Sequence, residues 1–222
     1  MADLVDDIFA VYKEEGMTSH DVVDEVRRCT GQRKVGHAGT LDPAARGVLV
    51  IGVGRPATRR LGTITEKEKE YVTRVKLGWR STTDDREGRK EPVPCPEVPT
   101  AEQVEQILKQ FEGTISQRPP AFSAIKIRGR VAYKLARAHK PVDLPPRTVE
   151  AKKIELLSYA WPRVELRLVT GPGFYVRSLA RDLGEALGTC GYIEMLERTR
   201  VGAFTKAQAL RLSDLRNLRR QT

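Results

Sequence analysis

One aspartate stands out in this sequence because of the residues on either side of it. Asp42 lies in the segment VGHAGTLDPAARGVLVIGVG (residues 35–54), where Gly36, Gly39 and Gly47 add conformational freedom. Pro43 stiffens the chain directly after the carboxylate and disfavours a helix at Asp42 itself. A carboxylate on such a loop is positioned for chemistry, but an Asp-Pro pair is also a common way to begin a turn. The spacing alone leaves both interpretations open.

A second group of residues could orient that carboxylate. In GPGFYVRSLARDLGEALG (residues 171–188), Arg177 falls between the end of an expected strand and the start of an expected helix. Its guanidinium could pair with a carboxylate there. Arg181 lies one turn further along the helix and could pair with Asp182 or Glu185. Spacing therefore does not decide which arginine is the important one.

The sequence gives little support for a metal site or for a nucleotide-binding site. His20, His37 and His139 are scattered without HxxxH or HxH spacing, and no glycine-rich phosphate-binding motif precedes a helix. We therefore expect no metal and no cofactor. His37 lies close to Lys34 and is flanked by glycines, which is compatible with an RNA contact or with a hydrogen-bonded structural histidine.

The apolar patterns predict the elements that carry these residues. Strands are expected at residues 8–13, 48–54 and 70–78, with two more over residues 152–171. Helices are expected after Thr18 or Ser19, after Thr100 and over residues 177–188. Proline and charge are dense over residues 82–99, so irregular structure is expected there, and residues 117–146 form a basic excursion. Strands and helices without a strict βαβ rhythm favour an α+β domain.

Composition narrows the function classes. Lys and Arg number 39 against 29 Asp and Glu, a formal charge of +10, which favours a polyanionic partner. Cys29, Cys95 and Cys190 are odd in number and far apart, so we expect neither a disulfide framework nor a zinc site. The N-terminus lacks an apolar signal region, and no run of about 18 apolar residues occurs. A soluble cytoplasmic protein is expected.

Six motifs together resemble the TruB-type pseudouridine synthases. The segment GHAGTLDPAARGVLVIGVGRPAT is similar to the catalytic loop of that family. The other motifs follow in the family's order, namely KEEGMTSHDVV, KEKEYVTRVKLG, PPAFSAIKIRGRVAYKLAR, GFYVRSLARDLGEALG and LERTRVGAF. The resemblance implies an α+β pseudouridine synthase fold, with a mixed, mostly antiparallel sheet flanked by helices and a thumb-like RNA-binding insertion at about residues 117–146. It assigns residues 1–215 to one catalytic domain and leaves residues 216–222 as a basic tail, with the usual C-terminal RNA-binding (PUA-like) domain expected to be absent.

The resemblance also implies an activity and a site. Uridine at position 55 in the T loop of tRNA would be flipped out and isomerised to pseudouridine, with Asp42 as the attacking carboxylate and no cofactor. Attack at C6 of the base and a glycal route at the sugar both remain open. Five further residues match substrate-binding positions of the family: Arg177 against the aspartate, Tyr71 stacked on the base, Tyr175 and Leu196 lining the uracil pocket, and His37 inserted where the base left.

RNA-backbone contacts are expected from basic residues of several motifs, namely Lys13, Lys34, Arg59, Lys69, Lys126, Arg128 and Arg130. Glu14 departs from the family pattern, which has proline there, and Asp85 matches the family's loop aspartate. The expected partner is the T arm of tRNA, bound by a monomer without a membrane or an obligatory protein partner. The alternative is a catalytically silent RNA-binding or RNA-folding module on the same fold.

Overall fold

The computed structural model describes residues 6–127, 129–138 and 140–220 of the chain. It divides the chain into two compact units where a single catalytic domain was expected. Unit 1 comprises Met1–Val72 with Leu196–Thr222, and unit 2 comprises Thr73–Met195. Residues 216–220, where a basic tail is expected to begin, belong to the last helix, Leu212–Arg220.

The elements of unit 1 include four whole strands, three α-helices and one short 3-10 helix. In chain order they are β1 (Ile8–Lys13), α1 (Ser19–Thr30), β2 (Val35–Ala38), β3 (Arg46–Val53), α2 (Gly54–Thr65), β13 (Phe204–Thr205), η2 (Lys206–Gln208) and α6 (Leu212–Arg220). Two longer strands, β4 (Lys69–Leu77) and β12 (Gly191–Val201), have residues in both units.

Unit 2 holds the remaining elements. They are β5 (Trp79–Ser81), β6 (Lys90–Pro92), α3 (Ala101–Lys109), β7 (Gly113–Gln117), β8 (Lys126–Ile127), β9 (Arg130–Val131), α4 (Ala132–Arg137), β10 (Arg147–Ala160), β11 (Arg163–Thr170) and α5 (Val176–Ala186).

The main sheet confirms the α+β prediction. Within the described residues it has nine strands, in the order β1-β3-β12-β4-β11-β10-β7, with β2 added to β3 and β13 to β12. The pairs β1/β3, β2/β3, β10/β11, β7/β10 and β12/β13 are antiparallel, and β3/β12 is parallel. The sheet is therefore mixed and mostly antiparallel.

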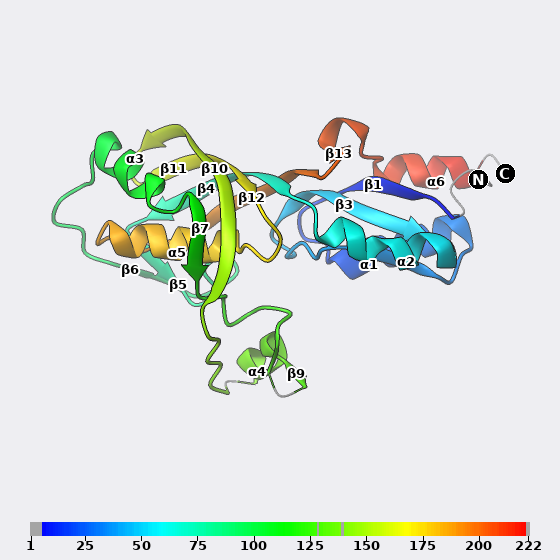
Figure 1. Ribbon diagram of the computed structural model, residues 1–222, viewed down its shortest axis with the longest axis horizontal. Coiled ribbons are helices and arrows are strands. Elements are labelled where there is room, and N and C mark those ends of the chain that lie inside the picture. The colour runs from blue at the N-terminus through cyan, green and yellow to red at the C-terminus, as the bar shows by residue number, and fades with distance from the viewer. Residues whose placement is uncertain (1–5, 128, 139, 221–222) are drawn as a thin grey trace. The chain divides into compact units, whose positions relative to one another are not determined.

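Strand β3 is the centre of unit 1, as its continuous apolar run predicts. Alternate side chains enter two different core clusters: Leu49, Ile51 and Val53 pack with residues of α1 and α6, whereas Val48 and Val50 pack with residues of α2. All five are fully buried. Burying one such side chain stabilises a fold by about 1.5 to 3 kcal/mol, so both faces of β3 hold the unit together (Figure 1).

The two N-terminal helices of unit 1 differ in how they begin. Helix α1 has the predicted cap, because the Thr18 hydroxyl accepts from the Asp21 backbone and the Asp21 carboxylate accepts from the Thr18 backbone. Helix α2, which the sequence analysis did not include, begins after Val53 without a side-chain cap and carries Pro56 in its first turn. Proline is tolerated there because the first turn lacks intrahelical acceptors for its N–H groups.

Unit 2 confirms the two long strands and the capped helix, and corrects one expectation. Helix α3 follows Thr100, which forms a capping box with Gln103. The segment expected to be irregular contains β6, which pairs with β5 in a two-stranded hairpin ending at Pro92. Proline fits this position because an edge residue needs no donor to a further strand.

The basic excursion is present as a small substructure between β7 and β10, which we call the thumb (residues 118–146). It holds the β8/β9 hairpin and helix α4, and Figure 1 shows these elements projecting away from the sheet of unit 2. No helix among the described residues is long and apolar enough to cross a membrane. In the same part of the chain, no group of three or more His, Cys, Asp or Glu is placed to hold a metal ion.

Candidate active site

The Asp42 loop connects β2 to β3 and is fixed at several points along the backbone. The Ser19 hydroxyl donates to the Leu41 carbonyl at 3.0 Å and accepts from the Leu41 amide at 2.9 Å. The Ala45 amide donates to the Asp42 carbonyl at 3.0 Å, which closes a turn. Asp42 is half-buried. Asp42 therefore begins a turn, and that turn is what presents its carboxylate.

Lys13 supports this loop from inside the unit. Its ammonium group donates to the carbonyls of Met17 at 2.6 Å, Glu14 at 3.0 Å and Pro43 at 3.3 Å, and its side chain is fully buried. Buried ammonium groups must satisfy their hydrogen bonds within the protein. Lys13 is thus not placed for the RNA-backbone contact that the motif suggested.

Glu14 departs from the family pattern, and its negative charge is paired with a cation at the surface. Its carboxylate lies 2.5 Å from the guanidinium of Arg211, and both side chains are about half exposed. Exposed ion pairs contribute only about 0 to 1 kcal/mol. The pair offsets the extra negative charge without adding much rigidity.

Tyr71, Arg198 and Asp42 form one charged cluster inside unit 1. The guanidinium of Arg198 donates to the Gly39 carbonyl at 3.0 Å in the Asp42 loop, and the charges of Arg198 and Asp42 both act on Tyr71. Burial raises the pKa of Tyr71, against the opposing influence of Arg198, and the Asp42 charge raises it further. Tyr71 therefore keeps its proton at neutral pH.

Lys69 lies close to the same cluster and is also buried. Its ammonium group donates to the Lys67 carbonyl at 2.6 Å and to the Thr65 carbonyl at 2.7 Å, at the C-terminal end of α2. A cation there complements the helix dipole. Burial, with a contribution from the charge of Arg198, lowers the pKa of Lys69 to about 8. Lys69 therefore caps a helix, which replaces its expected role at an RNA phosphate.

His37 is half-buried on β2. Within the described part of the chain, its Nδ1 atom is buried and has no hydrogen-bond partner. Burial lowers the pKa of His37, and the charges of Arg198 and His20 lower it further. The imidazole is therefore neutral at physiological pH, and its Nδ1 atom is enclosed by the protein.

In unit 2, the two candidate arginines, Arg177 and Arg181, have different neighbours. Arg177 is buried, donates to the carbonyls of Phe122 at 2.8 Å and Thr83 at 3.3 Å, and lies 3.9 Å from the Asp85 carboxylate. Arg181 lies closer to two carboxylates, those of Asp84 at 3.2 Å and Asp182 at 2.8 Å.

These neighbours explain how the two arginines differ. Carbonyl groups orient the buried guanidinium of Arg177 beside the Asp85 carboxylate, whereas Arg181 pairs with two carboxylates at shorter distances. The pairing of Arg177 with a catalytic carboxylate stays a prediction.

The start of helix α5 is tied to the base of the thumb. Gln117, fully buried, donates to the Tyr175 carbonyl at 3.1 Å and accepts from the Tyr175 amide at 2.9 Å. The Ser178 hydroxyl donates to the Arg118 carbonyl at 2.8 Å. Together with the bond from Arg177 to Phe122, these contacts fix the thumb base to the segment that carries Arg177 and Tyr175. Sequence analysis missed Gln117, because an isolated glutamine carries no signal.

Two comparisons with known proteins bear on this arrangement. Residues 27–176 match the TruB family pseudouridylate synthase (N terminal domain), and residues 177–222 match the tRNA pseudouridylate synthase B C-terminal domain. The tRNA pseudouridine synthase B of Thermobifida fusca is 44% identical over 96% of this chain and 75% of that protein. That of Mycobacterium tuberculosis is also 44% identical, over 94% of this chain and 71% of that protein.

The chain belongs to the TruB family.

Solved structures agree with this assignment. The chain resembles one in a Cbf5-Nop10-Gar1 complex, with a TM-score of 0.73 and 31% identity over 95% of this chain. It also resembles one in an H/ACA RNP bound to a substrate RNA containing 2'-deoxyuridine, with a TM-score of 0.70 and 28% identity. The chain spans about half the length of those chains, 53% and 52%.

Some of the basic residues expected to contact RNA phosphates are exposed, and others are buried. Lys34, Arg59, Lys126 and Arg130 are exposed, whereas Lys13 and Lys69 are buried. Arg128 lies outside the described residues. Leu196, expected at the uracil pocket, is partly exposed on β12.

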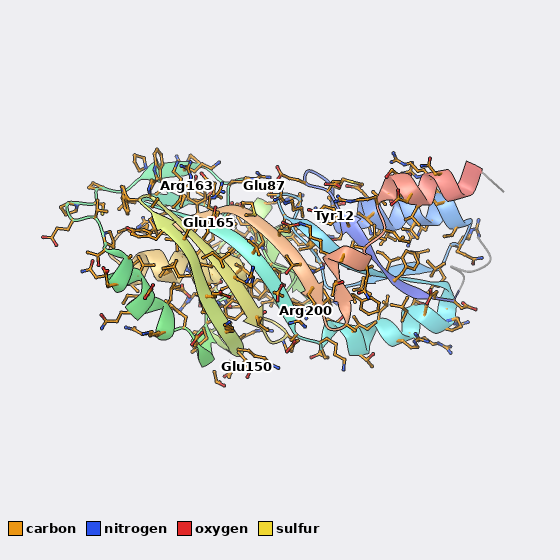
Figure 2. The ribbon with its side chains drawn as sticks, turned by 90° about the horizontal axis from the view of Figure 1, so that it is seen from above. Tyr12, Glu87, Glu150, Arg163, Glu165 and Arg200 are labelled. Atoms are coloured by element: carbon orange, nitrogen blue, oxygen red, sulfur yellow. The ribbon has the colours of Figure 1, made fainter. Side chains whose placement is uncertain are left out.

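A second buried network in this TruB-family chain escaped sequence analysis. The Tyr12 hydroxyl donates to Glu197 at 2.8 Å, and Lys206 lies 2.5 Å from the same carboxylate (Figure 2 labels Tyr12). Burial raises the pKa of Tyr12 most, and the hydrogen bond to Glu197 together with its charge raises it further, to about 12. The network joins β1, β12 and η2, whose residues are far apart in the sequence, so no local pattern could reveal it.

Proposed function

We propose that this chain isomerises the uridine at position 55 of the tRNA T loop to pseudouridine, with Asp42 as the catalytic carboxylate. The observation that carries the proposal is the Asp42 loop, which holds the catalytic-loop motif of a TruB-family chain and accepts hydrogen bonds from the buried Arg198. The tRNA substrate comes from the names of the relatives, which are tRNA pseudouridine synthases B.

The reaction needs a nucleophile and a way to hold the detached base. The bond between C1′ and N1 breaks, the base turns, and C1′ bonds to C5, which gives up its proton while N1 gains one. Attack by Asp42 at C6 and a glycal route at the sugar both begin with an ionised carboxylate. Positive charge nearby favours that form, and Arg198 supplies it within unit 1. From the motif match, we propose that Arg177 also pairs with Asp42.

The target base must leave the RNA stack before it can react, which costs a few kcal/mol. Stacking on an aromatic ring stabilises the flipped base by about 1 to 3 kcal/mol, which offsets much of that cost. We propose that Tyr71 provides that ring and that Tyr175 and Leu196 line the uracil pocket. From the motif match, we propose that His37 fills the space that the base leaves.

Phosphate contacts would come from exposed cations in each unit. Helix α2 carries Arg55, Arg59 and Arg60, no acidic residue, and no ion pair to these arginines among the described residues. We call these three the basic face of α2. Like charges in adjacent turns destabilise a helix slightly, so their retention fits a polyanionic partner. Lys34 lies beside the start of this helix, because its carbonyl accepts from the Gly54 amide at 2.7 Å.

The thumb supplies the second set of exposed cations, Lys126, Arg130 and Lys134. The last two line an open hollow of about 350 Å³ together with Lys140. We do not include Lys13 and Lys69 among the proposed phosphate contacts, because both are buried.

The test is pseudouridine formation in an unmodified tRNA transcript. Wild-type protein is compared with Asp42→Asn, and the wild-type transcript with one in which cytidine replaces the T-loop uridine. We expect product only when both the carboxylate and the uridine are present. Wild-type protein that binds the transcript and forms no pseudouridine would identify the silent RNA-binding module instead.

A further inference from the structure

Arg198 is an unusual residue for the interior of a protein. It lies on β12, is 1% exposed, and is among the largest fully buried side chains of the chain. Burial of a cation is costly unless its hydrogen bonds are satisfied. The groups that satisfy Arg198 therefore show what it is there to hold.

Those groups belong to the Asp42 loop and its flanking strand. The Nε atom donates to the Val48 carbonyl at 2.8 Å, and Nη2 donates to the Gly39 carbonyl at 3.0 Å. Nη1 lies 3.5 Å from the Thr40 carbonyl, and the charge of the guanidinium acts on Tyr71. One planar group thus binds carbonyls on both sides of Asp42.

The glycines of the loop fit around the same residue. Gly47 pairs with Arg198 in the parallel β3/β12 ladder, and a Cβ atom there would lie 2.2 Å from the Arg198 carbonyl oxygen. Gly39 has a φ of +82°, and its Cβ would lie 3.6 Å from Nη1 of Arg198. Gly47 is therefore required by how closely the loop lies against Arg198, whereas Gly39 is favoured by its positive φ.

We propose that Arg198 is a positioning residue for the reaction, holding the Asp42 loop and the Tyr71 ring in the arrangement that the chemistry requires. The inference rests on the proposed function. Arg198 acts through its neighbours and is not itself given a role in bond making. The competing explanation is that Arg198 only braces β3 against β12, in which case the protein would lose stability without a specific loss of chemistry.

The experiment separates these explanations by measuring chemistry and binding independently. Arg198→Lys keeps the charge but loses the planar fork, and Arg198→Met loses both. Arg200→Lys is the matched control, because Arg200 lies two residues along the same strand and pairs with Glu68 at 2.6 Å (Figure 2). For each protein, the single-turnover rate at saturating enzyme, the Kd for tRNA transcript and the Tm are measured.

We expect Arg198→Lys to slow the single-turnover step by about 100-fold, as misplacement by about 1 Å does elsewhere. Its Kd should change by less than about threefold, since Arg198 is buried, and Arg200→Lys should match the wild type in both measurements. Arg198→Met should be slower still. If it does not fold, Arg198→Lys alone carries the comparison.

Three results would overturn the inference. These are a wild-type rate in folded Arg198→Lys, an equal loss in Arg200→Lys, or a loss of binding as large as the loss of rate. Wild-type protein that forms no pseudouridine refutes the proposed function and the inference with it. An active wild type that Arg198→Lys equals refutes the inference alone.

Discussion

The close approach of β3 to β12 makes a sharp prediction for Gly47→Ala. An alanine Cβ would lie 2.2 Å from the carbonyl oxygen and 2.7 Å from the amide nitrogen of Arg198. Both atoms are backbone in a paired strand, so neither can move without disturbing the β3/β12 ladder. The φ of +114° adds strain, because only glycine adopts it readily.

The magnitude follows from these two effects. A residue forced into a sparsely populated backbone region costs about 1 to 3 kcal/mol. Overpacking at a tight contact costs about 1 to 3 kcal/mol more. The sum of about 2 to 6 kcal/mol is a large share of the usual total stability of about 5 to 15 kcal/mol. For a chain of this size, Tm should fall by roughly 5 to 20 °C.

The assay is urea unfolding combined with thermal unfolding of the wild type, Gly47→Ala and the control Gly62→Ala. Gly62 lies in α2 with no heavy atom within 4 Å of the position of a Cβ. Alanine should therefore stabilise that helix by about 0.5 to 1 kcal/mol. A loss below about 1 kcal/mol in Gly47→Ala, or equal losses in both variants, would refute the reasoning.

Two further predictions concern charge. Replacing all three arginines of the basic face of α2 by glutamine should lower the slope of log Kd for tRNA against log salt concentration by about 2, because each single-strand phosphate contact contributes about 0.7 to that slope. The control is Arg163→Gln, which should leave the slope unchanged because Arg163 already pairs with Glu194. Because folding lowers the pKa of Lys69 from 10.5 to about 8, the unfolded chain binds more protons over this range and stability rises with pH. Urea unfolding at pH 8 and pH 10 should show a smaller rise in Lys69→Met than in the wild type, and equal rises would contradict the assignment.

The sequence predicted the features that depend on neighbouring residues. Strand β1 and the Thr18 cap of α1 were located correctly, because the alternation of apolar side chains and the capping hydrogen bonds act over a few residues. The long strands β10 and β11 were predicted for the same reason. Helix α2 was missed because Gly54, Pro56 and Gly62 obscure its helical signal.

The catalytic loop was found from its sequence, but the reason for its shape was not. The sequence showed that glycines surround Asp42, and the motif predicted a catalytic role for its carboxylate. The carbonyl groups of this loop accept hydrogen bonds from Arg198, about 150 positions away along the chain. No local pattern distinguishes that arginine from Arg200, which lies two residues further along the same strand and pairs with a glutamate.

By itself, the sequence determined the family, the class of fold and the identity of the candidate nucleophile. Motif spacing and apolar periodicity depend only on residues that are near one another in the sequence. Only the tertiary structure decided which cations are available to RNA. Lys13 and Lys69 are buried against backbone carbonyls, whereas the arginines of the basic face of α2 are exposed. Burial depends on which distant segments pack together, and the free energy of desolvation then decides whether a cation holds the fold or meets a phosphate.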